Sequence, residues 1–502
     1  ELLEYTITFR SNLTNTGDMR WRIKQSAGVD YQLYSKTSFT SGNGYGGVIT
    51  TERDPGELSL IDHWAGGIQI NERGRFSTII IGQFLLGYGQ GLAYGSPMGI
   101  AKSTTAVSNA DRSYSRIRLN SSSLESIGFL GATARYNISG RNSLQAHYAK
   151  TPRDGKFEEG ELTLSGSGLH LTESSIEKSN ALMENVRGLA YEFTGEKLTA
   201  GTQFSNISYQ QTGFKEQINY GNFGSVWIGS SWFGHETAVD QFGKSAHYTF
   251  IRFRTEDIHW TIGHRWYAPG YISYFGNGFG EFSGTENETG FYLGAKWSQN
   301  GTQIQGYLDQ FSEISNSEDP ARSGSEFLIY AKQRLQTRMY LSGYFKNETK
   351  EVFDKAEMDG LVKKFTSLRN KNQFRLQWDY RTAEKIDLKS LIDMIRVNIA
   401  GKNYSGVQWS VKAGIPVSEK SRFLLFISPY FVEQSDASTY YFIMPVAGTM
   451  QLLRQTGRGL IYGTQFRYQF SPQARVTLFY MIKSELPAES AHLFALQMDV
   501  AF

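Results

Sequence analysis

The most regular feature of this chain is an alternation of apolar and polar residues, which is clearest in the last segment. Between residues 494 and 502, every second position holds a large apolar side chain, and the positions between them are polar or small. This period of two residues is the pattern of a β-strand with one apolar face. The apolar positions are Phe494, Leu496, Met498, Val500 and Phe502.

The same alternation recurs along the whole chain. It is found in residues 374–381 and 407–415, and again in residues 476–483 near the C-terminus. Because no linker or shift in composition divides the 502 residues, we expect one continuous β-structure rather than several domains. Near the front, the apolar face of another strand is predicted to hold Phe76, Ile80, Phe84, Leu86 and Tyr88.

Tight turns and long polar connections alternate between these strands. This arrangement places the long connections at one end of the sheet and both termini at the other. Following the alternation, we count about 24 strands, with a range of about 22 to 26. The tight turns are 71–74, 139–142, 299–302, 336–337 and 418–421, and the long connections are 89–122, 151–187, 268–289, 349–370 and 434–458.

Hydropathy excludes a helical membrane protein but allows a membrane-spanning barrel. The mean hydropathy is −0.40, and no apolar run approaches the roughly 18 residues of a spanning helix. Barrel strands alternate in polarity, so their average stays polar. The terminal Phe502 resembles the C-terminal signature that the insertion machinery of outer-membrane barrels reads. A soluble β-sandwich would share the alternation, but the terminal Phe, the 14% aromatic residues and the unequal turns favour the barrel.

The sequence therefore predicts an all-β protein: one multi-pass transmembrane antiparallel barrel over residues 1–502 in a bacterial outer membrane. We expect short periplasmic turns and long extracellular loops. The chain begins at Glu1 without a signal segment and reads as a processed or truncated product. A barrel this wide needs a filled lumen. We expect the loops 89–122 and 151–187 to fold inward as a plug, or the barrel to be flattened, with short helices at 173–186 and 352–368.

Three segments carry a resemblance to a known family. Residues 82–103 read GQFLLGYGQGLAYGSPMGIAKS, residues 168–188 read GLHLTESSIEKSNALMENVRG, and residues 265–280 read RWYAPGYISYFGNGFG. These resemble a family of Bacteroidota-type outer-membrane barrels named for an N-terminal helix-hairpin-helix domain, although its Tyr-Pro-Gly-Tyr motif here reads Tyr267-Ala268-Pro269-Gly270-Tyr271. The name-giving domain is not in these residues. Such domains bind nucleic-acid backbone, so the resemblance implies a link to DNA at the envelope.

Charged residues on the polar faces supply the candidate site. The chain has 51 Lys and Arg against 48 Asp and Glu, yet the positions predicted to point inward lean basic. A basic channel of low dielectric concentrates anions. The competing interpretation is that these cations pair with Asp379, Asp499 and loop carboxylates. The lumen candidates for anion binding are Arg252, Arg254, Arg265, Arg338, Arg375, Arg381, Arg467 and Arg475.

Other kinds of site find little support in the sequence. The eight histidines lack metal-ligand spacing, no nucleophile stands beside a base, and cysteine is absent, so we expect no catalysis, metal or other cofactor. The glycines of residues 87–95 lack the Lys-Ser/Thr of a phosphate loop and are interpreted as a bend over the barrel rim. Tryptophans are expected mainly in the girdles at the lipid interfaces: Trp227, Trp232, Trp260, Trp266, Trp297, Trp378 and Trp409.

These features predict a non-enzymatic, porin-like transport or translocation component with a loop-gated basic lumen, with DNA uptake as one version. The alternative is an occluded barrel that anchors surface loops or binds partners in an outer-membrane assembly. The expected partners are the lipid bilayer and lipopolysaccharide, the barrel-insertion machinery and other proteins of an outer-membrane complex. Nucleic acid is a further partner implied by the resemblance.

Overall fold

The computed structural model describes residues 16–26, 30–57, 59–95, 102–112, 114–158, 161–166, 168–210, 216–282, 284–314, 320–358, 361–486 and 490–502. No helix in these ranges is long and apolar enough to cross a membrane.

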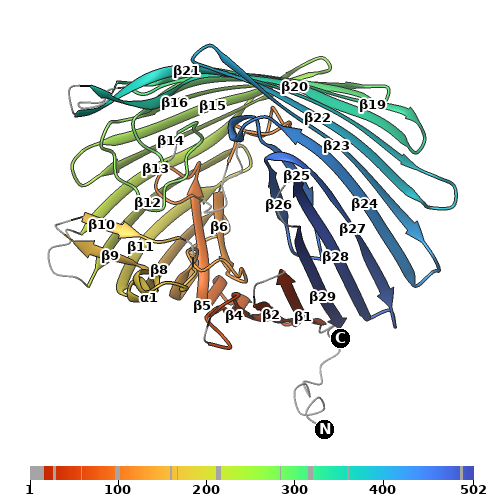
Figure 1. The fold of residues 1–502 in the computed structure, drawn as a ribbon. Helices are drawn as coiled ribbons and strands as arrows, with labels where there is room; N and C mark the ends of the chain where they lie inside the picture. The colour runs from red at the N-terminus through yellow and green to blue at the C-terminus, as the bar shows by residue number, and fades with distance from the viewer. Residues whose placement is uncertain are drawn as a thin grey trace, which may run out of the picture.

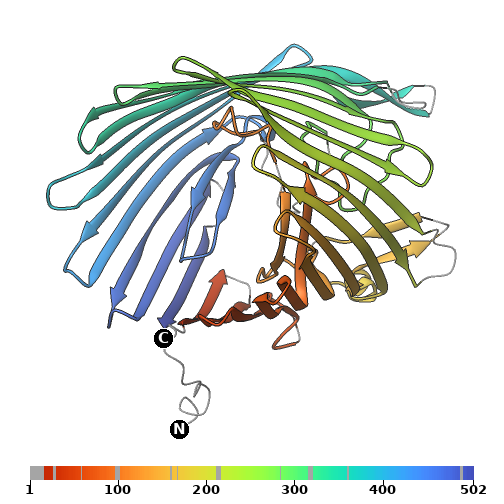
Figure 2. The same ribbon diagram turned by 180° about the vertical axis from the view of Figure 1, so that it is seen from behind.

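The described residues form a closed antiparallel barrel of 24 strands, as the sequence predicts (Figures 1 and 2). Sequential strands pair as neighbours, with a break in order only where an inserted segment intervenes. The wall strands are β1 (Thr16–Ser26), β2 (Tyr31–Thr40), β3 (Tyr45–Arg53), β4 (His63–Arg73), β5 (Phe76–Gly89), β7 (Phe129–Asn137), β8 (Asn142–Arg153), β11 (Leu182–Thr194), β12 (Leu198–Tyr209), β13 (Gln217–Ile228), β14 (Ser231–Asp240), β15 (Ser245–Thr255), β16 (Ile258–Tyr267), β17 (Glu288–Gln299), β18 (Thr302–Ser312), β19 (Ser323–Gln336), β20 (Met339–Met358), β21 (Leu361–Arg381), β22 (Asp387–Ile399), β23 (Lys402–Pro416), β24 (Ser421–Val432), β27 (Gly457–Gln469), β28 (Ala474–Leu486) and β29 (Ala491–Ala501).

The last residue of the chain completes the closure. Strand β29 pairs with β1, and Phe502 exchanges two backbone hydrogen bonds with Gly17, at 2.7 and 2.8 Å. The ring of Phe502 lies so close to Gly17 that a Cβ there would sit 2.3 Å from a ring carbon. The terminal aromatic therefore belongs to the seam of the barrel, where it requires a glycine opposite.

The outer face is apolar over the height of the wall. In β29, Phe494 and Met498 are exposed, whereas Leu493, Ala495 and Gln497 face inward and are buried. Short turns such as 300–301 and 417–420 lie at the end that holds both termini, which is the periplasmic end in barrels of this kind. The turns predicted at 139–142, 299–302, 336–337 and 418–421 all fall at this end.

Two of the seven tryptophans expected in the lipid-interface girdles face the lumen rather than lipid. Trp227 lies opposite Trp232, with ring centroids 5.1 Å apart, and Trp232 packs against buried residues inside the barrel. The girdle interpretation is wrong for this pair, because their register places them on the same face as Glu236. The other five share a face with exposed apolar residues of the wall: Trp260, Trp266, Trp297, Trp378 and Trp409.

Strand β5 departs from the simple pattern. Its first half pairs with β4 and β7, but its second half pairs with β6 (Tyr114–Leu119). The apolar face that the sequence predicts here, including Ile80, Phe84 and Leu86, is buried in the interior, and the lipid side carries Ile81 instead. The end of β5 therefore leads the chain into the lumen.

Both predicted helices differ from the structure. Helix α1 (Glu173–Lys178) is short, and β11 begins at Leu182, within the range expected to be helical. The described residues of 352–368 form no helix, because β20 and β21 continue as a long hairpin through this region. The structure also contains a hairpin of β9 (Gly155–Glu158) and β10 (Glu161–Leu164), a 3-10 turn η1 (Ser435–Ala437), and a hairpin of β25 (Thr439–Ile443) and β26 (Gln451–Gln455).

Candidate functional site

Residues 90–112, called the inner segment below, contact the lumen side of the wall. Of these, 96–101 lie outside the described residues. Gly89 and Gly91 have φ values of +53° and +86°, which let the chain bend sharply at the end of β5. The carboxylate of Glu236 on β14 then accepts hydrogen bonds from the backbone N–H of Gln90 and, at 3.2 Å, of Leu92. A wall carboxylate thus holds the first turn of the inner segment.

Hydroxyl groups of the next strands hold the second half of the inner segment. Thr261 on β16 donates to the carbonyl of Val107 at 3.0 Å, and Tyr292 on β17 donates to the carbonyl of Ala106 at 2.6 Å. Tyr248 on β15 donates to the carbonyl of Ala110. These hydroxyls satisfy backbone acceptors that would otherwise be buried without partners.

Lys102 connects the inner segment to a buried ionic network. Its Nζ lies 2.7 Å from Asp309 on β18 and 2.5 Å from Glu281 of the 268–287 loop. Asp309 in turn accepts two hydrogen bonds from Arg265, which also pairs with Glu288. Burial alone would lower the pKa of Lys102, but Asp309 and its acidic neighbours raise it overall, so the amine stays charged.

The loop 268–287 covers the inner segment from within the barrel. Tyr271 donates to the carbonyl of Leu92 at 3.2 Å, and Gly95 donates its N–H to the carbonyl of Phe275 at 2.8 Å. Arg112 donates to the carbonyl of Asn277 at 3.1 Å. The Tyr-Ala-Pro-Gly-Tyr stretch is therefore part of the packing that keeps the inner segment in the lumen.

The hairpin of β25 and β26, called the inner hairpin below, occupies the other side of the lumen (Figure 1). Its residues Tyr441 and Ile443 belong to a buried cluster with Phe426 and Tyr430 of β24. The Nζ of Lys412 donates to the carbonyl of Phe442 at 2.8 Å. The inner segment thus clusters with the wall strands β14 to β19, whereas the inner hairpin clusters with β22 to β29.

Below the inner hairpin, cationic side chains gather at the periplasmic end of β20 to β27 and enclose a cavity of about 640 Å³. Arg381 and Arg422 share one carboxylate, Asp387. Arg467 contacts Gln465 at 3.4 Å and has no carboxylate partner among the described residues. Asp379, which is 3.9 Å from Lys389, is the second carboxylate of the cavity. We call the six cationic side chains that line this cavity the basic mouth: Arg338, Arg381, Lys389, Lys412, Arg422 and Arg467.

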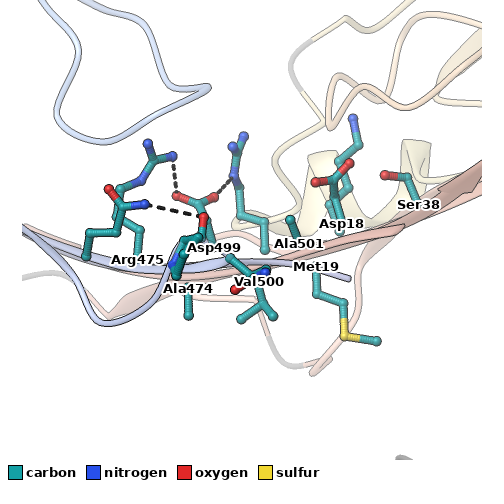
Figure 3. A pocket seen from close by; sticks show the side chains of 13 residues that line it. Asp18, Met19, Ser38, Ala474, Arg475, Asp499, Val500 and Ala501 are labelled. Atoms are coloured by element: carbon teal, nitrogen blue, oxygen red, sulfur yellow. Dashed lines mark hydrogen bonds and ion pairs between the residues drawn. The ribbon is translucent and has the colours of Figure 1, made fainter. Parts of the chain in front are cut away.

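Cationic side chains also outnumber carboxylates at the seam of the barrel, where β29 pairs with β1 (Figure 3). There, Asp499 on β29 lies between Arg20 and Arg475, at 2.5 and 3.0 Å, and adjoins a cavity of about 440 Å³. Lys36 and Asp18 also line this cavity. Two arginines again share one carboxylate, so the periplasmic part of the lumen is basic over a wide arc.

The structure separates the eight predicted arginines into groups. Arg338, Arg381 and Arg467 meet in the basic mouth, and Arg475 lies at the seam. The remaining four have other contacts: Arg252 pairs with Asp111 of the inner segment at 3.1 Å, Arg254 donates to the carbonyl of Glu256, Arg265 is buried in the ionic network, and Arg375 pairs with Asp393 at 2.6 Å.

Sequence reasoning missed Arg422 and Lys389. In the run Arg422-Phe423-Leu424-Leu425-Phe426, consecutive apolar residues hide the alternation, because Phe426 faces inward and packs on the inner hairpin. The sequence predicts that the glycine-rich stretch 87–95 bends over the rim. It bends into the lumen instead, and its N–H groups cradle a carboxylate of the protein itself, Glu236.

The fold resembles solved outer-membrane proteins at low sequence identity. A siderophore receptor PirA from Acinetobacter baumannii has a TM-score of 0.50 and 7% identity, with 99% of this chain and 82% of that chain covered. The copper transporter OprC has a TM-score of 0.50 and 6% identity, with 98% and 83% covered. PirA from Pseudomonas aeruginosa scores 0.47 at 9% identity, with 99% and 81% covered. No protein-family model matches the sequence, and no curated protein matches it.

At these identities the likeness concerns the fold alone. The closed barrel and its exposed apolar outer face identify a multi-pass β-barrel of the bacterial outer membrane.

Proposed function

We propose that this protein is a non-enzymatic transport component of the outer membrane that passes an anionic solute. The observation that carries the proposal is the basic mouth. Six cationic side chains face a cavity of about 640 Å³ with two carboxylates, Asp379 and Asp387. Cations in excess of their partners inside a low-dielectric wall raise the local concentration of anions. The cavity lies at the periplasmic end of the lumen, where a solute leaves the barrel.

We further propose that the inner segment acts as the gate. Hydrogen bonds and ion pairs to side chains of the wall hold it in place, and it is not itself a strand of the wall. Such contacts break without disturbing the hydrogen bonds between strands. The gate therefore opens, in this proposal, when the first turn leaves Glu236 and Lys102 leaves Asp309.

Proteoliposomes test the choice of solute. Vesicles that hold the purified Lys102→Met/Glu236→Gln variant, which lacks the two gate contacts, are loaded with inorganic phosphate, tripolyphosphate or a neutral disaccharide, and the release of each is followed. The proposal predicts faster release of the two phosphates than of the sugar, and a smaller difference at high salt because salt screens the cations. Equal release of all three solutes would contradict anion selection.

A narrower version takes nucleic acid as the cargo. Its support is the resemblance to the helix-hairpin-helix family together with a basic mouth that suits phosphate backbones. Short single-stranded DNA in the same assay, with binding measured against salt, tests this version. Release of phosphate without binding of DNA would leave the general proposal standing and remove the narrower one.

The second candidate is an occluded barrel that serves as an anchor for a surface assembly. What favours it is the filling of the lumen by the inner segment, the inner hairpin and the 268–287 loop. Co-purification separates the candidates. Loss of a stably bound partner when the β9–β10 hairpin is deleted, with no solute release even from the Lys102→Met/Glu236→Gln variant, would favour the anchor.

A further inference from the structure

The outer rim of the barrel brings together residues that bind metals elsewhere in proteins. Glu125 lies in the connection between β6 and β7, Asp154 follows β8, and His170 precedes α1. One ligand atom from each of these three residues lies within 4.8 Å of the others. Asp54 and Asp62, which flank the connection between β3 and β4, form a second such group that shares Glu125.

We propose that Glu125, Asp154 and His170, supplemented by Asp54 and Asp62, form a binding site for a divalent metal cation. Three ligand atoms that lie no more than 4.8 Å apart allow one cation to sit roughly 2–2.8 Å from each. This is close to the oxygen distances of Ca²⁺ and within a small adjustment of those of Mn²⁺ or Zn²⁺. The imidazole of His170 favours a borderline cation of the Mn²⁺ or Zn²⁺ kind over Ca²⁺.

The charge balance of the cluster supports a cation. In the described part of the chain, no Lys or Arg nitrogen lies within 4.0 Å of a carboxylate of Asp54, Asp62, Glu125 or Asp154. The ion-pair partner within the group is His170, whose Nε2 is 2.8 Å from Asp154 and whose Nδ1 is 3.6 Å from Glu57, so a single imidazole faces several carboxylates. Partly buried carboxylates in such proximity repel one another unless a positive charge lies between them.

A separate observation comes from His63, the residue after Asp62. His63 lines a cavity of about 580 Å³ together with Asp62, Glu125 and Asp154. Its Nε2 is shielded from solvent and has no hydrogen-bond partner in the described ranges. A buried imidazole nitrogen without a partner is unusual, and it marks this cavity as polar space that a cation with its water ligands can fill.

The ligands come from three connections that are far apart in sequence, 54–62, 120–128 and 154–181. A cation would therefore tie these connections together above the wall strands β3 to β11. This role concerns the outer rim and does not depend on which solute the barrel passes.

Metal binding is measured on the whole protein in detergent after treatment with EDTA, by calorimetric titration with Mn²⁺, Zn²⁺ and Ca²⁺ in turn. The proposal predicts saturable binding of one equivalent of Mn²⁺ or Zn²⁺, weakened at least about tenfold by Glu125→Gln and by His170→Gln. Glu158→Gln is the matched control, because the Glu158 side chain is 65% exposed and pairs with Lys156 on the neighbouring hairpin.

Thermal unfolding gives a second readout. The metal should raise the unfolding midpoint of the wild type and of Glu158→Gln, but not of Glu125→Gln. Absence of saturable binding, or binding that Glu125→Gln leaves unchanged, would overturn the site. Tight binding of Ca²⁺ that is insensitive to His170→Gln would overturn the assignment of His170 as a ligand.

Discussion

Glu236 and Leu92 are 144 residues apart in sequence, yet the carboxylate of the first accepts the N–H of the second at 3.2 Å inside the barrel. The same carboxylate accepts the N–H of Gln90. Consecutive backbone N–H groups around Gly91 form a concave anion site, and a side chain of the wall occupies it. The contact fixes the point at which the chain leaves the wall and enters the lumen.

Glu236→Gln should loosen the inner segment, because an amide accepts hydrogen bonds less strongly than a carboxylate. The chain has no cysteine, so a single Ala106→Cys substitution gives a clean probe of this buried position. We expect Glu236→Gln to speed labelling of Cys at this position by a polar maleimide at least about tenfold. Glu196→Gln in an exposed turn is the control, and equal labelling in the two variants would show that Glu236 does not hold the segment.

Lys102→Met should destabilise the closed state through its effect on the ionic network. The substitution leaves Glu281 without one of its two lysine partners and removes a positive charge from beside Asp309. Truncating one member of a buried ion pair typically costs about 3–5 kcal/mol. Urea unfolding in detergent measures the loss. Adding Glu281→Gln should recover part of it, and a double variant no more stable than Lys102→Met would contradict this network.

Arg467→Glu should reduce anion preference more than Arg381→Glu or Arg422→Glu, because those two arginines share Asp387 whereas Arg467 has no carboxylate partner among the described residues. The measurement is the reversal potential in a salt gradient across a planar bilayer, made in the Lys102→Met/Glu236→Gln background so that the barrel conducts. Arg141→Glu, in a turn at the same end of the barrel, serves as the control for rim charge. An unchanged reversal potential in Arg467→Glu would exclude this residue from selectivity.

The lipid-facing assignment is tested by two adjacent positions of β21. Leu376 is exposed on the outer face, whereas Gln377 faces the lumen and donates to Asp379 at 2.6 Å. Leu376→Arg near the middle of the wall should cost about 2–4 kcal/mol. Gln377→Arg should cost much less, because water and Asp379 accept the charge. A reversed order in urea unfolding would mean that the faces are assigned the wrong way round.

The closed barrel and its strand number follow from the sequence because each strand repeats one physical rule, an apolar residue toward lipid at every second position. The rule fails where the interior is also apolar. In β5, Phe84 and Leu86 pack inside against the rest of the core, and in β24 Phe426 packs on the inner hairpin. Alternation does not distinguish an apolar face in lipid from one in a packed lumen.

The candidate site was predictable only in part for a related reason. The alternation of polar and apolar residues shows which arginines point inward, and the arginines predicted for the basic mouth do point inward. The alternation does not show which carboxylate each arginine contacts, because partners such as Arg265 and Asp309 lie 44 residues apart on different strands. The helix expected at 352–368 was wrong because β20 and β21 extend far beyond the wall as a paired hairpin, whose cross-strand bonds replace those of a helix.

Bilayer conductance of the wild type beside the double variant Lys102→Met/Glu236→Gln tests the gated, anion-passing barrel most directly. The account predicts little or no steady conductance from the wild type and anion-selective steps several times larger from the double variant. A large steady conductance in the wild type, or steps in the double variant that favour cations, would contradict it.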